Sequence, residues 1–211
     1  MEKTVLEDIQ ERLAATRKEL EAEIERQLEE QRTRFQYHLQ RGKVRFERDV
    51  RKLQAKYRIG LWPYITRARL AYVLTAPVIY GLIIPLVLLD LSVTVYQHIC
   101  FRAYGIPRVR RGDHIVIDRH HLAYLNGLEK LNCIYCSYAN GVIAFAREIA
   151  GRTEAFWCPI KHARRAADPH DHFEAFFEYG DAETYRKWLD SQRKDSKPTT
   201  GKKNAEGLST F

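Results

Sequence analysis

The sequence is poor in cysteine, in proline over its first quarter and in charge over one internal stretch. Two of these absences exclude a class of protein, and the absence of proline favours a type of secondary structure. Four cysteines among 211 residues exclude a disulfide-dense secreted scaffold, in which cysteine exceeds about 8% of the residues. Residues 1–58 contain no proline and one glycine, Gly42, and therefore favour helix. Residues 70–89 contain no charged side chain, which excludes a wholly soluble single domain.

The chain carries a formal net charge of +8, and its composition changes along its length. The length suits one modest domain with appendages. We expect a mainly α-helical protein in four parts: a long, charged, coiled-coil-like helix with a basic end over 1–69, a hydrophobic membrane segment over 70–101, a small α+β Cys/His metal-binding domain over 102–190, and a disordered tail over 191–211.

Apolar residues recur every eleven positions in the N-terminal segment, at Leu13, Ile24, Phe35, Phe46 and Tyr57. Eleven residues in three turns is about 3.67 residues per turn, which predicts a nearly straight or slightly right-handed helical bundle. Because such a stripe needs a partner, we predict a homo-oligomer formed through this helix. The alternative is a single charged helix that lies along the membrane or folds back onto the domain.

Charge is sorted along the same segment. Residues 1–30 contain 10 acidic and 5 basic side chains, a net of −5, whereas residues 31–58 contain 10 basic and 2 acidic side chains, a net of +8. A basic block can bind nucleic acid, but no readout motif accompanies it. Anionic lipid headgroups explain it better, because each juxtamembrane cation gains about 1 kcal/mol near such a surface. We therefore predict a lipid bilayer and an unidentified protein as partners, and no nucleic acid.

Between Arg69 and Arg102 the only charged residue is Asp90. A continuous helix of this length would extend about 48 Å, against a hydrocarbon core of about 30 Å. Either a single tilted span uses residues 70–89, or the prolines and glycine of 77–85 bend the segment into a hairpin. Because both flanks are basic and such flanks stay cytoplasmic, we favour the hairpin, with the N-terminus and the Cys/His domain facing the cytoplasm.

Local patterns predict the elements of the C-terminal part. β-Branched residues over 113–118 predict a short strand, and helical spacing predicts helices over 120–130 and 137–150, the second ended by the following glycine. Aromatic residues over 173–179 have the spacing of a buried helical face, and residues 181–190 have the pattern of a last short helix.

One constellation points to a metal. Cys133 and Cys136 form a C-x2-C pair, and Cys158 and His162 follow after 21 intervening residues. A tight turn would let the first pair hold one ion, and a helix begun by Pro159 would place the second pair on one face. The set matches a tetrahedral Cys3His Zn²⁺ site, which would also staple a small domain poor in sheet.

Three other interpretations of the thiols stay open. Together with Cys100 the cysteines are numerous enough for an iron–sulfur cluster, although their spacing fits no standard ferredoxin. Cys133 and Cys136 are alternatively a redox dithiol, or all four cysteines are reduced, buried and without a ligand. Each interpretation requires a reducing compartment.

Other histidines lie outside that set. A polar cluster ends the predicted strand: Asp118, Arg119, His120 and His121. It can supply a carboxylate to His162 or a general base, but such a cluster more often caps a helix. His170 and His172 follow Pro169 in polar sequence, which predicts a solvated loop.

The sequence contains no nucleophile elbow, phosphate-binding glycine loop or His-Glu-x-x-His pair, and four protein ligands leave a zinc ion no open position. We therefore predict a non-enzymatic, membrane-anchored cytoplasmic module with a structural zinc, serving as a scaffold or partner-binding protein. The alternatives are a membrane-bound redox or electron-transfer protein that uses the same cysteines, and a zinc-dependent hydrolase that uses Asp118, His120 or His121.

Three stretches carry a resemblance to a known family: residues 117–126, residues 133–141 with the pattern C-x-Y-C-x-Y-A-N-G, and residues 157–165 with W-C-P-I-K-H. They resemble a family of uncharacterised bacterial membrane proteins that bear this signature, and the similarity extends over residues 75–182. The resemblance implies a bacterial, membrane-associated protein in which the C-x2-C pair and the C-P-I-K-H segment belong to one unit. For such a protein we predict the inner (cytoplasmic) membrane. It implies no mechanism.

Overall fold

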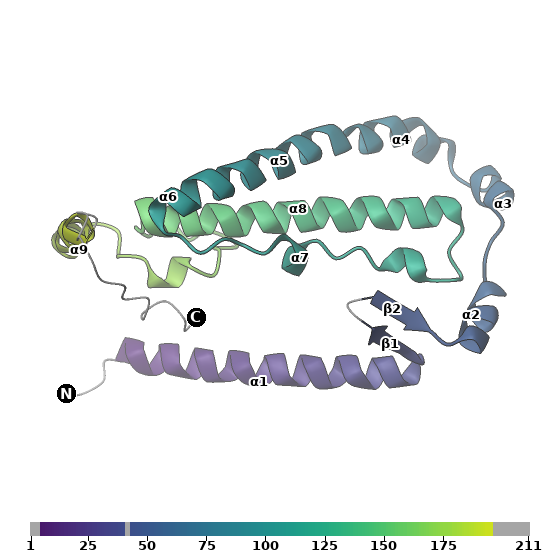
Figure 1. The fold of residues 1–211 in the computed structure, drawn as a ribbon, viewed down its shortest axis with the longest axis horizontal. Helices are drawn as coiled ribbons and strands as arrows, with labels where there is room; N and C mark the ends of the chain where they lie inside the picture. Colours follow the sequence, from purple (N-terminus) through teal and green to yellow (C-terminus); the bar gives the residue numbers. More distant parts are fainter. Residues whose placement is uncertain (1–4, 41–42, 196–211) are drawn as a thin grey trace. The chain divides into compact units, whose positions relative to one another are not determined.

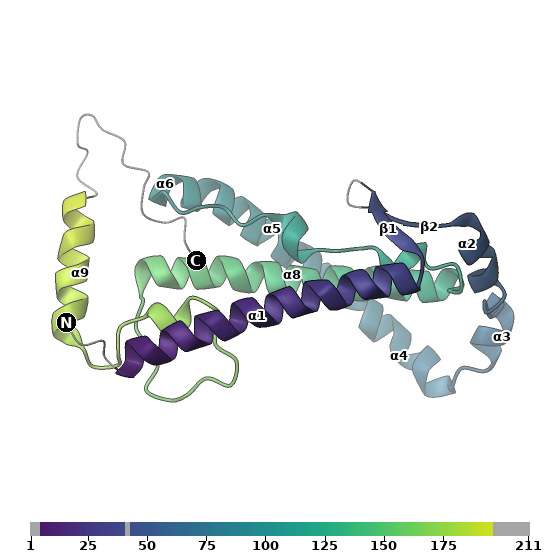
Figure 2. The same ribbon diagram turned by 90° about the horizontal axis from the view of Figure 1, so that it is seen from below.

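The computed structural model describes residues 5–40 and 43–195, and it is mainly helical, as predicted (Figures 1 and 2). In chain order the elements are α1 (Val5–Arg34), β1 (Tyr37–Gln40), β2 (Lys43–Phe46), α2 (Arg48–Ala55), α3 (Leu61–Thr66), α4 (Leu70–Gly81), α5 (Ile83–Tyr96), the π-helical turn η1 (Gln97–Phe101), α6 (Arg102–Tyr104), α7 (Arg111–His114), the 3₁₀ turn η2 (Arg119–His121), α8 (Gly127–Trp157), the 3₁₀ turn η3 (Phe173–Ala175) and α9 (Ala182–Asp195).

The chain divides into two compact units. The first consists of residues 1–85 and 115–141, and the second of residues 86–114 and 142–211. Helix α8 therefore contributes residues to both units.

The N-terminal segment is not one helix, so that prediction was wrong beyond residue 34. Helix α1 ends at Arg34, and Gln36 adopts a positive φ of 52°. Strands β1 and β2 then form an antiparallel hairpin in which Tyr37 lies opposite Phe46, with 5.5 Å between their ring centroids. Apolar and polar residues alternate along this stretch, a period of two that favours strand and that the eleven-residue repeat concealed. The described residues show no coiled coil.

Among the described residues, one helix is long and apolar enough to cross a membrane, Leu70–Tyr104, and only 6% of its most apolar window is buried. This single helix replaces the two arms of the hairpin that we favoured (Figure 1). It ends in a Schellman motif, in which Gly105 adopts a φ of 73° and the N–H of Ile106 donates to the carbonyl oxygen of Phe101 at 2.9 Å.

Helix α8 is continuous from Gly127 to Trp157 (Figure 1). It starts with a capping box: the N–H of Glu129 donates to Oδ1 of Asn126 at 3.0 Å, and the N–H of Asn126 donates to Oε2 of Glu129 at 2.8 Å. The predicted helix over 137–150 is therefore part of a longer one. Gly151 does not end it, contrary to our prediction.

Two further predictions for the C-terminal part were wrong. Residues 113–118 form no strand, and residues 120–130 are helical only at η2 and in the first turn of α8. Residues 102–190, all of them described, contain no strand beyond a single bridge between Ile160 and Phe177. The structure therefore does not show a separate α+β Cys/His domain.

The last helix is confirmed. Helix α9 begins next to Asp181, as predicted, and extends to Asp195. Asp181 caps its start, since Oδ1 of Asp181 accepts the N–H of Thr184 at 3.1 Å. Hydrogen bonds from Thr184 lower the pKa of Asp181, so this cap is charged at neutral pH. The aromatic run before it is no helix: Phe176 is buried after the short turn η3, whereas Tyr179 is exposed. Residues 191–195 of the predicted disordered tail are helical, so the tail prediction was wrong there, and residues 196–211 lie outside the described residues.

The second unit contains the main apolar core. Phe101 and Val109 pack there against Phe145 and Ile149 of α8. The buried side of α8 also includes Val142, whereas Ile143 is 55% exposed. In the first unit, the hydroxyl of Tyr135 donates to the carbonyl oxygen of Ile79 at 2.6 Å and so joins α8 to α4.

Candidate functional site

The predicted metal ligands lie on and just after helix α8. Cys133 and Cys136 are three residues apart inside the helix, one half-buried and the other exposed, rather than at the tight turn that we predicted. Cys158 follows the last residue of α8 and is exposed. These three cysteines and Cys100 are free thiols.

His162 does not lie on a helix begun by Pro159, because the carbonyl oxygen of Pro159 accepts the N–H of Phe177 at 2.8 Å. The His162 ring stacks instead on Phe173, with 5.7 Å between the ring centroids. In the part of the chain that the structure describes, no three His, Cys, Asp or Glu side chains form a group that could hold a metal ion. Every residue between the C-x2-C pair and the next cysteine is helical. The Cys3His zinc site stays a prediction, which elemental analysis of the purified protein would decide.

A basic cavity of about 420 Å³ lies within the first unit. Three segments that are distant in sequence form it: β2 with α2, the turn η2, and the first turn of α8. The lining residues are Val44, Arg45, Phe46, Arg48, Arg51, His120, His121 and Lys130. His120 and His121, for which the sequence allowed either a chemical role or a helix-capping role, thus line this cavity.

The same cluster does not cap a regular helix. Asp118 makes no side-chain capping hydrogen bond, although its carbonyl oxygen accepts the N–H of His121 at 3.0 Å. The rings of His120 and His121 lie against each other, with 4.0 Å between their centroids. Oε1 of Gln54 accepts the N–H of Ala123 at 3.4 Å and so joins α2 to the segment after η2.

Sequence reasoning recognised the basic block but not the cavity. Arg48 and Arg51 are three residues apart, which is a signal that they lie on one side of a helix. Lys130 carries no such signal, because its approach depends on contacts between segments about 80 residues apart in the chain.

A second cluster lies in the other unit, where His170 and His172 contact helix α8 instead of forming the solvated loop that we predicted. Nε2 of His170 is 2.8 Å from Oε2 of Glu154, and Nε2 of His172 is 3.2 Å from Oε1 of Glu148. Nε of Arg152 donates to the same Glu148 oxygen at 2.7 Å. Burial raises the pKa of Glu148, but hydrogen bonds from Arg152 and His172 outweigh burial and hold that pKa below its ordinary value. The cluster therefore fastens the segment after α8 to the helix through an ionised carboxylate.

Gly151 makes this contact possible, because a Cβ there would lie 3.0 Å from Nδ1 of His170 and 3.1 Å from Cδ2 of His172. We expect Gly151→Ala to loosen residues 168–177 even though alanine favours helix by about 1 kcal/mol. Amide hydrogen exchange of this segment should accelerate about fivefold. Gly127→Ala is the control, since a Cβ there meets nothing within 4 Å. Unchanged exchange in Gly151→Ala would show that the histidines do not depend on this close approach.

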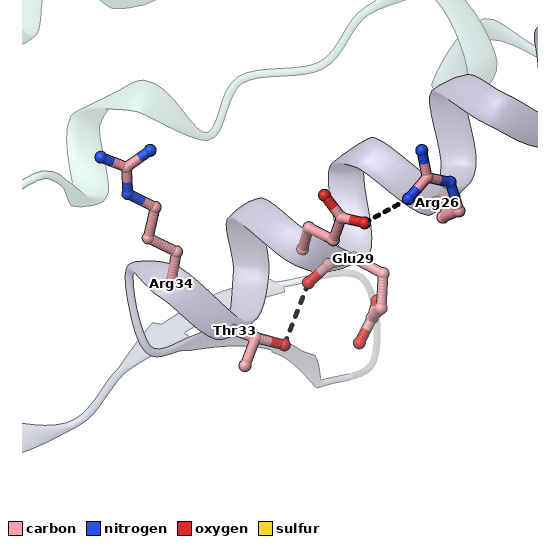
Figure 3. Close-up of a pocket in the computed structure, with 5 residues that line it drawn as sticks. Arg26, Glu29, Thr33 and Arg34 are labelled. Carbon is pink, nitrogen blue, oxygen red and sulfur yellow. Dashed lines mark hydrogen bonds and ion pairs between the residues drawn. The ribbon is translucent and has the colours of Figure 1, made fainter.

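A shallow hollow on α1 carries no comparable chemistry. Its lining residues are Arg26, Glu29, Glu30, Thr33 and Arg34, all from one helix (Figure 3). Their polar groups bond to one another: a guanidinium nitrogen of Arg26 donates to Glu30 at 2.5 Å, and the hydroxyl of Thr33 donates to the carbonyl oxygen of Glu29 at 3.1 Å. We therefore do not count this hollow as a site.

Comparison of the chain with family models, curated proteins and solved structures found no match. The resemblance to bacterial membrane proteins stays a prediction, and function is argued from the residues.

Proposed function

We propose that the protein is a non-enzymatic module held at the cytoplasmic face of a bacterial inner membrane by the helix Leu70–Tyr104, with α1 as its surface for a partner. The observation that supports the anchor is the exposure of this helix. Its exposed apolar residues include Leu70, Val73, Leu74 and Val78 in the first unit, and Leu88, Leu91, Val95 and Ile99 in the second. Exposed apolar residues in such number on one apolar segment are typical of contact with lipid.

Other side chains of the same helix have polar partners. In the second unit, Asp90 is 8% exposed and accepts hydrogen bonds from Arg111 at 2.7 and 3.2 Å. In the first unit, the hydroxyl of Tyr80 donates to Oδ1 of Asn132. Each unit therefore brings a polar side chain to this helix, and in the second unit that side chain is charged.

These partners disfavour a transbilayer orientation. A hydrocarbon core of about 30 Å takes about 20 residues, and any such stretch of this 35-residue helix includes Tyr80 or Asp90. A span that includes Asp90 would bring a charged side chain into the bilayer, at about 2.5–3.5 kcal/mol at its centre. A span that includes Tyr80 would bring the polar amide of Asn132 there. A helix that lies along the interface avoids both costs, since its apolar face enters the acyl region and its polar contacts stay at the headgroups.

Charge on both flanks supports the same orientation. Arg67 and Arg69 precede the helix, and Arg102, Arg108 and Arg110 end or follow it. Basic flanks stay on the cytoplasmic side of a membrane. An interfacial helix keeps both flanks on that side, whereas a single span would place one of them on the opposite side.

Helix α1 offers a narrow apolar stripe. The stripe consists of Ile9, Leu13, Leu20, Ile24 and Leu28, all of them exposed and spaced by four or seven residues. Ion pairs lie along the same helix, such as Arg26 with Glu23 at 2.6 Å, and the hydrogen bond from Arg26 lowers the pKa of Glu23 to about 2. A stripe of this width pairs with another helix of the same kind, so a second copy of α1 is the partner that we propose.

Depth measurements on the full chain in vesicles test the anchor. A fluorophore attached in turn at Leu74, Leu88 and Ile99 should be quenched to the same depth by lipids labelled along their chains, about 5–10 Å below the headgroups. The control is a fluorophore at Tyr179, which is 69% exposed outside the anchor and should escape quenching. Full-length fusions should also report a cytoplasmic N-terminus and a cytoplasmic C-terminus. A deeper position for Leu88 than for the other two, or termini on opposite sides, would refute the interfacial helix.

A further inference from the structure

We propose that the basic cavity of the first unit binds a phosphate group, carried either by a lipid headgroup or by a soluble phosphate ester. The inference does not rest on the membrane anchor, because it uses only the residues that line the cavity.

The charge of the cavity is unbalanced. Arg45, Arg48, Arg51 and Lys130 bring four cations to one cavity, and none of its eight lining residues is acidic. The acidic side chains next to these residues in sequence, Glu47, Asp49 and Glu129, do not line the cavity. The carboxylate of Asp49 lies 3.6 Å from Nζ of Lys52, and that of Glu129 belongs to the capping box of α8. The lining of the cavity therefore brings cations together without a counterion, and a bound anion would relieve their mutual repulsion.

The kind of cation favours phosphate. Guanidinium groups present a planar fork of donors that matches two phosphate oxygens, and lysine adds a point charge. Arg48 and Arg51 are three residues apart on α2, so they project from neighbouring positions of one helix. Arg45 approaches from β2 and Lys130 from α8. Donors from three separate segments can surround one anion, which a single helix face cannot do.

The rest of the lining suits a phosphate ester rather than a bare ion. A volume of about 420 Å³ lies within the usual range for small-ligand sites, about 300–1,000 Å³. Val44 and Phe46 give the cavity an apolar side, against which the carbon skeleton of an ester can pack. Nδ1 of His120 is buried without a hydrogen-bond partner, so the protein itself does not complete the hydrogen bonding of this imidazole.

Titration of the full chain in uncharged detergent micelles tests the proposal. Inorganic phosphate and glycerol 3-phosphate are the soluble probes, and phosphatidylglycerol in mixed micelles is the lipid probe. Isothermal calorimetry at about 150 mM salt should detect binding in at least one arm, and Arg48→Gln/Arg51→Gln should weaken it about tenfold or more. Binding of the soluble probes would identify a phosphate-ester site, and binding of the lipid alone would identify a headgroup site.

Arg164→Gln/Arg165→Gln is the matched control, because it removes the same charge from exposed positions of the second unit, outside both the cavity and the basic flanks of the anchor. It should leave binding unchanged within about twofold. Equal weakening by both double variants would show general charge attraction and overturn the site. Absence of binding to all three probes would also overturn it. Circular dichroism of both variants checks that the helices are intact, and a variant with the two arginines replaced by lysine should retain part of the affinity.

Discussion

Replacing Arg111 with methionine should lower the free energy of unfolding of the protein by about 3 kcal/mol. Nε of Arg111 donates to Oδ1 of Asp90 at 3.2 Å, and Nη2 donates to Oδ2 at 2.7 Å. Asp90 is buried on an otherwise apolar helix, so its charge would stay desolvated after its guanidinium is removed. Loss of one partner of a buried pair costs about 3–5 kcal/mol. We expect a loss near the lower end of this range, because the Arg111 side chain is 49% exposed and its charge is partly solvated.

Arg110→Met is the matched control for this change. The side chain of Arg110 is 85% exposed, and its ion pair with Asp113 spans 3.9 Å, so its removal should cost less than about 0.5 kcal/mol. The double variant Asp90→Leu/Arg111→Met should recover most of the loss, because it leaves no buried charge. Denaturant unfolding of the full chain in uncharged detergent, followed by circular dichroism, measures all three variants. Equal losses for Arg110→Met and Arg111→Met would contradict this role of the pair.

The helical apolar segment from Leu70 and the buried face of α8 could be predicted because both signals are local, although we favoured a bent hairpin for the first. Residues 70–89 lack charge, and an apolar stretch of that length favours one long helix whatever surrounds it. Phe145 and Ile149 are four residues apart, so they share a face of any helix that contains them. The capping box of α8 was equally local: Asn126 precedes Glu129 by three positions, and attention to that pair would have placed the start of the helix correctly.

Features that depend on distant contacts were not predictable. Arg111 reaches Asp90 across 21 positions, and no spacing rule links them. Gly151 obeys the local rule for a helix end, yet contacts with His170 and His172 explain a glycine in the middle of α8. Tertiary contacts of this kind override local preference.

The cysteine pair shows where a motif is ambiguous. Two cysteines three residues apart fit a metal-binding turn, but they also fit neighbouring positions on a helix face. The sequence around Cys133 and Cys136 contains no proline between residues 108 and 158, and a capped helix start precedes the pair. These two signals favour the helix that the structure shows. Attention to them would have led us to predict a helix rather than a tight turn at Cys133 and Cys136.

Replacing Phe145 with alanine should cost about 3–5 kcal/mol of unfolding free energy. Phe145 is fully buried and packs with Phe101, Val109 and Ile149 in the core of the second unit. The loss combines the transfer free energy of the ring with the cavity that it leaves, since neighbouring side chains relax only in part. The same denaturant titration measures it, and hydrogen exchange should show lost protection in α8 around the substitution.

Ile143→Ala provides the control on the same helix, because Ile143 is 55% exposed and alanine has the higher helix propensity. It should change the unfolding free energy by less than about 0.5 kcal/mol. Phe101→Ala should lose as much as Phe145→Ala, and the double variant should lose less than the sum, because the two rings share one core. Phe101 belongs to the helix Leu70–Tyr104 and Phe145 to α8, so such coupling would show that the apolar segment is part of the folded core. Additive losses would mean that the two helices are stabilised independently, and the shared core would then be refuted.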